Sequence, residues 1–137
     1  MGFLEKLIKR KKMTQYVFLK GKVEGEEKMG LIAQAKSLIM PSRYENFSIV
    51  ALEAIALGKP LLCFDISGLK WIPEDTAVKA TPFSTTILAK NIEKISIDKK
   101  FRELLRRKTL ELSASYSWSI ILQRYQEYMY YVMEENK

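Results

Sequence analysis

Hydrophobic positions change their spacing several times along this chain, and each change marks the border of an expected element. Short apolar runs rich in β-branched and aromatic residues alternate with longer stretches that have helical spacing. The stretch after Ser48 is typical of a helix that ends at Gly58 as its left-handed cap, with Pro60 just beyond. We therefore expect strands at 16–19, 37–40 and 60–65, and helices at 26–35 and 48–57 between them.

The pattern at the two ends of the chain predicts further helices. Residues 3–12 have the spacing of a basic amphipathic helix, and a short strand at 77–80 precedes helices at 86–97, 99–112 and 118–134. Apolar strands separated by helices are typical of a parallel sheet covered on both faces. The predicted fold class is α/β, with a Rossmann-like open parallel sheet. A single domain spans 1–137, its β-α-β-α-β core lies at 16–80, and C-terminal helices occupy 86–134.

Composition limits the chemistry that the chain can perform. A length of 137 residues suits one hydrophobic core. The absence of histidine excludes a Ser-His-Asp triad and His-ligated zinc within the chain. The single cysteine, Cys63, lies in the apolar string LLCF and is expected to be a buried structural thiol. No membrane span or secretory signal is recognisable, so we expect a cytoplasmic protein.

The net charge of +7 is concentrated in two segments. Residues 1–28 hold eight Lys or Arg against four Glu, and residues 98–108 hold six Lys or Arg against two acids. Such patches attract phosphorylated molecules or anionic lipid, although most are solvated helix faces. The chain lacks the basic-aromatic interleaving of RNA-binding sheets and a helix-turn-helix pattern, so nucleic acid is not an expected partner.

The segment PSRYENFSIVALEAIALGKP, residues 41–60, carries the most informative acids. In an open parallel sheet, ligands bind beyond the carboxyl ends of the strands, where this segment and the loops 20–26 and 65–73 are expected. The free N–H groups at the start of the helix favour a phosphate. Glu45 lies in the loop before that helix, and Glu53 lies inside its apolar run, where an unpaired carboxylate is costly.

Two readings of these acids remain open from the residues alone. In one, a diphosphate on the helix terminus, with sugar hydroxyls on either side, supplies partners for both carboxylates. In the other, Glu53 caps a backbone or pairs with a lysine such as Lys59 or Lys70, and Glu45 is an exposed loop acid.

A glutamate, seven residues and a second glutamate in this setting resemble the signature of retaining nucleotide-sugar glycosyltransferases of family 4, which have the GT-B fold. The similarity extends from about Tyr16 to Tyr131 and includes VFLKGKV, DISGLKWI and the closing YSWSIILQRYQEYMYYV. The resemblance implies most of a nucleotide-binding C-terminal domain. It implies a nucleotide-diphosphate sugar as donor, a glycan or lipid-linked acceptor, no cofactor and no metal, consistent with the lack of an Asp-x-Asp pair.

The resemblance also implies roles for particular residues. Glu45, the catalytic candidate, would accept hydrogen bonds from hydroxyls of the donor sugar, and Glu53 would accept them from the ribose. Ser48 stands where the family commonly has glycine. The remaining implied donor contacts are the backbone N–H groups of Asn46, Phe47 and Ser48 toward the sugar, those of Ile49 and Val50 toward the diphosphate, and Lys20 and Gly21 near the base.

Parts of the resembled enzymes have no counterpart in this sequence. These are the acceptor-binding N-terminal domain and an Arg and a Lys that precede the segment seen here and stabilise the leaving phosphate. We therefore expect the chain alone to be a very poor enzyme. The alternatives are a non-catalytic sugar-nucleotide binder, one chain of a split glycosyltransferase, or a basic peripheral protein for which the fold is only a scaffold.

The C-terminal helix is more apolar than one buried stripe requires. Ile121, Tyr125, Tyr128 and Val132 share a face, and six further apolar residues widen the coverage. The helix either packs entirely on the sheet or exposes part of this surface. In the second case we expect self-association, contact with the missing N-terminal half, or peripheral contact with the inner membrane face aided by the basic N-terminal helix.

Overall fold

Three parallel strands form the centre of the protein in the computed structural model, which describes residues 2–135. The strands are β1 (Leu38–Met40), β2 (Leu61–Phe64) and β3 (Ala77–Ala80), in the spatial order β1-β2-β3. Leu38 lies opposite Leu61, which lies opposite Ala77, so all three strands run in register along the same direction. The strands expected at 37–40, 60–65 and 77–80 and their parallel pairing are confirmed.

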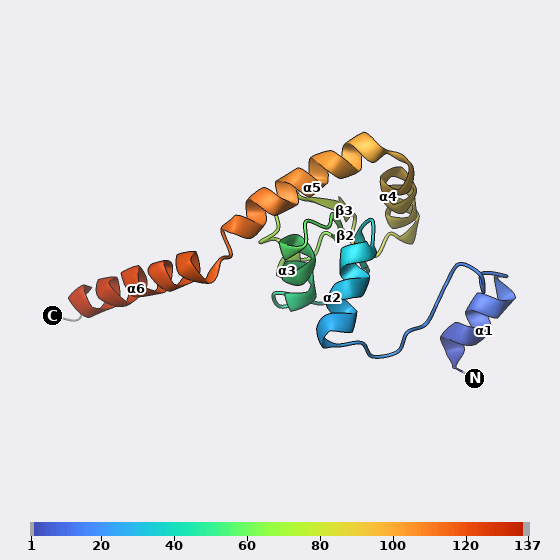
Figure 1. Cartoon of the computed structure of the whole chain (residues 1–137), viewed down its shortest axis with the longest axis horizontal. Coiled ribbons are helices and arrows are strands. Elements are labelled where there is room, and N and C mark those ends of the chain that lie inside the picture. Colours follow the sequence, from blue (N-terminus) through green and yellow to red (C-terminus); the bar gives the residue numbers. More distant parts are fainter. Residues whose placement is uncertain (1, 136–137) are drawn as a thin grey trace.

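Helices cover both faces of this sheet (Figure 1). The elements α2 (Gly25–Gln34) and α3 (Ile49–Ala56) pack on one face, and α4 (Thr85–Ile97) packs on the other. The helix α5 (Lys99–Ala114) contacts both α3 and α4. Alternate residues of β2 enter different cores, because successive side chains of a strand point to opposite faces. The predicted α/β class is confirmed.

The end of α3 has the cap that the sequence predicts. Gly58 adopts a φ of 64° and donates its N–H to the carbonyl of Ile55 at 2.9 Å, and Lys59 donates to Ala54 at 2.8 Å. These two bonds form a Schellman motif, which satisfies the last carbonyls of the helix. The chain is thereby turned directly into Pro60 and β2, which fixes α3 against the sheet.

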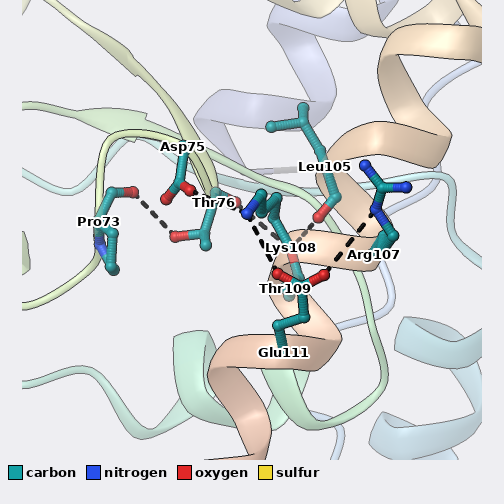
Figure 2. A network of polar contacts seen from close by, with 8 residues as sticks. All are labelled: Pro73, Asp75, Thr76, Leu105, Arg107, Lys108, Thr109 and Glu111. Atoms are coloured by element: carbon teal, nitrogen blue, oxygen red, sulfur yellow. Dashed lines mark hydrogen bonds and ion pairs between the residues drawn. The ribbon is translucent and has the colours of Figure 1, made fainter.

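A polar network fastens α5 to the turn that precedes β3 (Figure 2). The buried hydroxyl of Thr109 donates to the carbonyl of Leu105 at 2.7 Å and lies 3.4 Å from the carbonyl of Thr76. Thr76 in turn donates to the carbonyl of Pro73, and Lys108 lies 3.7 Å from the carboxylate of Asp75. The network therefore holds the edge of the sheet where β3 begins.

The strand expected at residues 16–19 is wrong. Among the described residues this segment pairs with no strand, and Tyr16 and Phe18 are 70% and 72% exposed. An extended segment becomes a strand only when a neighbour bonds its backbone. The order β1-β2-β3 follows the chain, like the 4-5-6 half of the doubly wound order 3-2-1-4-5-6. In that order the preceding strand lies at the far edge, so it has no neighbour among these three.

The two ends of the chain extend away from the sheet (Figure 1). The helix α1 (Phe3–Arg10) is followed by an extended segment, and α6 (Trp118–Glu135) projects beyond α5 without a buried residue. Both helices appear where the sequence predicts them. Within residues 2–135, no helix combines the length and the apolar character that crossing a bilayer requires.

Cys63 is buried in β2, as the apolar string around it predicts. Burial is the main reason why the pKa of this thiol is raised from 9.0 to about 11. The thiol is therefore a packing group at neutral pH.

Candidate functional site

The N-terminus of α3 opens at the carboxyl edge of the sheet. The loop 41–48 leaves β1 at that edge and leads into the helix, and the loop after β2 leaves from the same edge. Ligands of open α/β sheets bind in this region because loops from neighbouring strands converge there. The structure therefore places the segment with both glutamates where the sequence predicts a site.

The first turn of α3 has free backbone donors. Ser48, its N-cap, has a φ of 61°, and no side chain caps the helix. The first hydrogen bond of the helix runs from the N–H of Leu52 to the carbonyl of Ser48, so the N–H groups before Leu52 have no helical acceptor. The first turn also carries no acid. These donors and the helix dipole together favour an anion.

Ser48 holds the backbone in the left-handed region, which glycine occupies without strain. Its side chain is buried, and its hydroxyl lies 4.0 Å from the sulfur of Met40 at the end of β1. The glycine that the resembled family commonly has at this position would adopt the same φ more easily. Compared with a glycine, Ser48 therefore has the same left-handed backbone and an additional small, buried side chain.

Glu53 pairs with a lysine, as the second reading of the sequence expects, although with one that the sequence did not single out. Its Oε1 lies 2.6 Å from the Nζ of Lys28, which belongs to α2, and the two side chains are 22% and 30% exposed. Lys59 and Lys70, the two lysines considered from the sequence, are not its partners. The second oxygen, Oε2, is buried without a hydrogen-bond partner among the described residues. Part of the acceptor capacity of Glu53 is therefore unused.

A groove of about 240 Å³ borders Glu53. It lies between α2, α3 and the end of α5, and its lining is mostly apolar. The lining residues are Met29, Ile49, Leu52, Glu53, Ala56, Ser113 and Tyr116. The groove therefore offers a mostly apolar surface next to one carboxylate.

Glu45 is held by a close backbone approach from the loop after β2. It is half-buried, and its carboxylate makes no hydrogen bond or ion pair with another residue of 2–135. A Cβ placed on Gly68 would overlap the carbonyl oxygen of Glu45. Beside it, the side-chain oxygen of Asn46 accepts a hydrogen bond from the hydroxyl of Tyr44 at 2.8 Å. The loop geometry therefore depends on glycine at position 68.

Three aromatic rings pack together beside the loop 41–48. Phe47 stacks on Trp71 with ring centroids 4.6 Å apart, and Tyr116 meets Trp71 edge-on at 5.4 Å. Each ring comes from a different segment: the loop before α3, the loop after β2, and the junction of α5 and α6. Offset and edge-on pairs of this kind stabilise a fixed arrangement. Phe47 is thereby fixed immediately before Ser48.

Lys20 and Gly21 do not lie at this groove. Lys20 lines a separate groove between α1 and the segment 14–20, and Gly21 is an exposed residue with a φ of 69°. Their suggested place near a nucleotide base stays a prediction.

The sequence did not point to Lys28, Gly68 or the aromatic cluster. Lys28 and Glu53 are 25 positions apart, so no helical spacing links them. Gly68 lies in a short 3₁₀ helix, Ser67–Leu69, and only the neighbouring loop shows why a glycine is needed there. All three features depend on contacts between distant segments.

Comparisons with known proteins identify the family of this chain. The family described as Glycosyl transferases group 1 matches residues 2–111. Alpha-D-kanosaminyltransferase of Streptomyces kanamyceticus is 32% identical over 119 residues, covering 85% of this chain and 31% of that protein. O-antigen chain mannosyltransferase B of Escherichia coli is 27% identical over 115 residues, covering 84% of this chain and 30% of that protein.

A solved structure has a similar fold. Sucrose-phosphate synthase from Thermosynechococcus elongatus superposes with a TM-score of 0.80 at 29% identity, covering 96% of this chain and 34% of that one. The chain thus spans about a third of the length of the proteins it matches. Since the family match covers most of its residues, this chain belongs to the Glycosyl transferases group 1 family.

Proposed function

We propose that this chain is the donor-binding part of a retaining, metal-independent glycosyltransferase that uses a nucleoside-diphosphate sugar. The observation that carries the proposal is the start of α3, where uncapped amides adjoin a carboxylate with an unpaired oxygen. The acceptor would be a glycan or a lipid-linked sugar, as in the resembled enzymes.

The diphosphate would lie on the first turn of α3. The N–H groups of Ile49 and Val50 have no helical acceptor, and the absence of an acid in that turn leaves the local charge favourable to phosphate. Backbone N–H groups of Asn46, Phe47 and Ser48 would face the sugar. Because Trp71 stacks on Phe47, these donors are preorganised.

The two carboxylates would bind hydroxyl groups on either side of the diphosphate. Glu45 has no other polar partner among residues 2–135 and would accept hydrogen bonds from the transferred sugar, as the catalytic candidate. Glu53 would accept them from the ribose, while the mostly apolar groove beside it would hold the nucleoside. Lys20 and Gly21 would approach the base only after a movement of their segment.

Metal independence is part of the proposal. Among residues 2–135, no group of three or more His, Cys, Asp or Glu side chains is arranged to hold a metal ion. In the proposed site the amides of α3 supply the electrostatic stabilisation of the diphosphate. The dependence of binding on EDTA and on added Mg²⁺ tests this part separately.

A second candidate is a non-catalytic sugar-nucleotide binder or one chain of a split glycosyltransferase. The chain spans about 31% of the kanosaminyltransferase, which favours a role that depends on further residues. Both candidates require the same donor site. Turnover separates a non-catalytic binder from a split enzyme. A split enzyme should transfer sugar once the chain that carries the rest of the enzyme is added, whereas a non-catalytic binder should not.

Calorimetric titration with UDP, GDP and ADP tests the donor site. Glu53→Gln keeps the side-chain shape but loses the charged acceptor, so we expect binding to weaken by roughly 1.5–3 kcal/mol. Glu45→Gln should weaken binding of a nucleotide sugar more than binding of the free nucleotide.

Glu74→Gln is the matched control, because it removes a carboxylate that pairs with Lys79 at 3.0 Å on the turn before β3. It should bind like wild type. If Glu53→Gln also bound each nucleotide as tightly as wild type, the ribose assignment would be wrong.

A further inference from the structure

The carboxylate proposed to bind ribose is tied to a neighbouring helix. Lys28 lies in α2, and its Nζ is 2.6 Å from the Oε1 of Glu53 in α3. Both side chains are largely withdrawn from water, in contrast to the pair of Lys22 and Glu24, whose side chains are 81% and 72% exposed. An ion pair that is partly buried is screened less and restrains its partners more than an exposed one.

The two oxygens of Glu53 differ in their surroundings. Oε1 is occupied by Lys28, whereas Oε2 is buried and has no donor within the described part of the chain. An ionised carboxylate can accept about four hydrogen bonds, and leaving a buried oxygen without a donor is costly. The fold therefore fixes one side of the carboxylate and leaves the other side unsatisfied.

We propose that Lys28 is a positioning residue of the donor site. It holds Glu53 through Oε1, so that Oε2 remains the acceptor for a ribose hydroxyl of a nucleotide in the groove. This inference rests on the proposed function. Because Oε2 is covered in this structure, a hydroxyl reaches it after a groove side chain moves aside, and the contact with Lys28 keeps the carboxylate in place during that movement.

Lys28 has a second, less specific effect on the same ligand. Its charge offsets that of Glu53, which would otherwise repel a diphosphate bound on the first turn of the same helix. Loss of the charge alone should weaken every nucleoside diphosphate alike. Loss of positioning should weaken only a nucleotide that carries ribose hydroxyls, and this difference separates the two effects.

The experiment measures affinities of the 137-residue chain for UDP, GDP and ADP, and for the 2′,3′-dideoxy form of the tightest binder. Wild type should prefer the ribonucleotide by about tenfold or more, the size expected for hydrogen bonds to a charged acceptor. In Lys28→Met this preference should fall to within about twofold, by the same argument. Lys28→Arg, which keeps a cation on α2, should restore most of the preference.

Lys108→Met is the matched control. It removes one positive charge and two ion pairs, of 3.2 Å to Glu111 and 3.7 Å to Asp75, and its side chain is 37% exposed, close to the value for Lys28. It should leave the ribose preference unchanged. Thermal unfolding of each variant confirms folding, and Lys28→Gln replaces Lys28→Met if the latter does not fold.

The outcomes distinguish a failure of the donor site from a failure of the positioning role of Lys28. If wild type binds none of the nucleotides, the donor site itself fails, and the role of Lys28 with it. If wild type binds with a ribose preference but Lys28→Met keeps that preference, or binds more tightly, Lys28 has no positioning role although the donor site stands. Equal loss for the ribo and dideoxy forms would show a charge effect only and would also overturn the positioning role.

Discussion

At the scale of single residues, the site depends on atoms whose contacts come from distant parts of the chain. The sequence identified Glu45 and Glu53 because an acid in an apolar helix needs an explanation. It could not identify Lys28 or Gly68, because an ion pair between two helices and a contact between two loops leave no local pattern. At this scale the sequence therefore identified the two unusual acids but not the residues that contact them.

Gly68 gives a sharp prediction at this scale. In Gly68→Ala the new methyl group would overlap the carbonyl of Glu45, so one loop must move. We expect a loss of roughly 1–3 kcal/mol in the free energy of unfolding, as for other overpacked sites, together with weaker nucleotide binding. Urea denaturation and calorimetry measure the two effects.

Gly30→Ala is the control for that substitution. Gly30 lies inside α2, and nothing lies within 4 Å of a Cβ placed on it. Alanine there should stabilise the protein by about 0.5–1 kcal/mol. If Gly68→Ala proved as stable as wild type and bound nucleotide equally well, the backbone contact would not hold the loop of Glu45.

Cys63 predicts a pH dependence of stability. Its pKa is raised to about 11 by burial, above the ordinary value of 9.0. A group whose pKa is raised on folding contributes stability that is complete below the unfolded pKa and is lost as the pH rises through the folded pKa. The free energy of unfolding should therefore fall more steeply between about pH 9 and pH 11 for wild type than for Cys63→Ala.

Labelling with a thiol reagent checks the same residue directly. At pH 8 the native protein should react slowly, because only the thiolate attacks, and unfolding in urea should expose one reactive thiol. Rapid labelling of the native state would contradict the burial.

At the scale of elements, the sequence predicted those that carry their own signals. The helix α3 ends in a Schellman motif at Gly58. The N-caps of α4 and α5 are Ser84 and Asp98, whose side chains accept hydrogen bonds from the backbone N–H groups of Ile87 and Phe101. Residues 16–19 have strand composition but no backbone neighbour, so composition alone gave a wrong strand. Caps are local, whereas strand pairing is not.

The helix α6 gives a prediction at this scale. Most of its apolar residues are exposed, with Tyr125 and Tyr128 at 62% and 63%, so the expectation of a surplus apolar surface is confirmed. What covers this surface stays a prediction. We expect the chain to self-associate at micromolar concentration or to bind anionic liposomes, because an apolar helix surface of this extent favours contact with a partner.

Sedimentation and liposome flotation measure these two outcomes. The double variant Tyr128→Ser and Tyr131→Ser should weaken either association, since both rings lie on α6 and more than half of each is exposed. A wild type that stayed strictly monomeric and ignored liposomes would refute the interaction surface.

At the scale of the whole molecule, the fold gathers most of the candidate site residues at one edge of the sheet. Three strands and their helices bring the amides of α3, Glu45 and Glu53 to one edge of the sheet. The residues described here span about a third of the matched proteins. The sequence predicted this fold class because the alternation of strands and helices is a property of the entire chain.

Turnover is predicted at this scale. We expect the 137-residue chain to transfer no measurable sugar from UDP-, GDP- or ADP-sugars, since the resembled enzymes stabilise the leaving phosphate with an Arg and a Lys that have no counterpart here. Binding of the free nucleotide should persist weakly. Release of nucleoside diphosphate measures transfer, and robust turnover by the purified chain would overturn the expectation.

Binding of a nucleoside diphosphate at the start of α3 underlies every role proposed for the site. Amide chemical shifts of the ¹⁵N-labelled chain, followed during titration with UDP, GDP and ADP, test it most directly because they locate the ligand residue by residue. We expect the largest changes at Phe47, Ser48, Ile49 and Val50, with smaller changes around Glu53. Largest changes instead at the basic residues lining the opposite end of the sheet, Lys36, Lys59, Arg102 and Arg106, would contradict it.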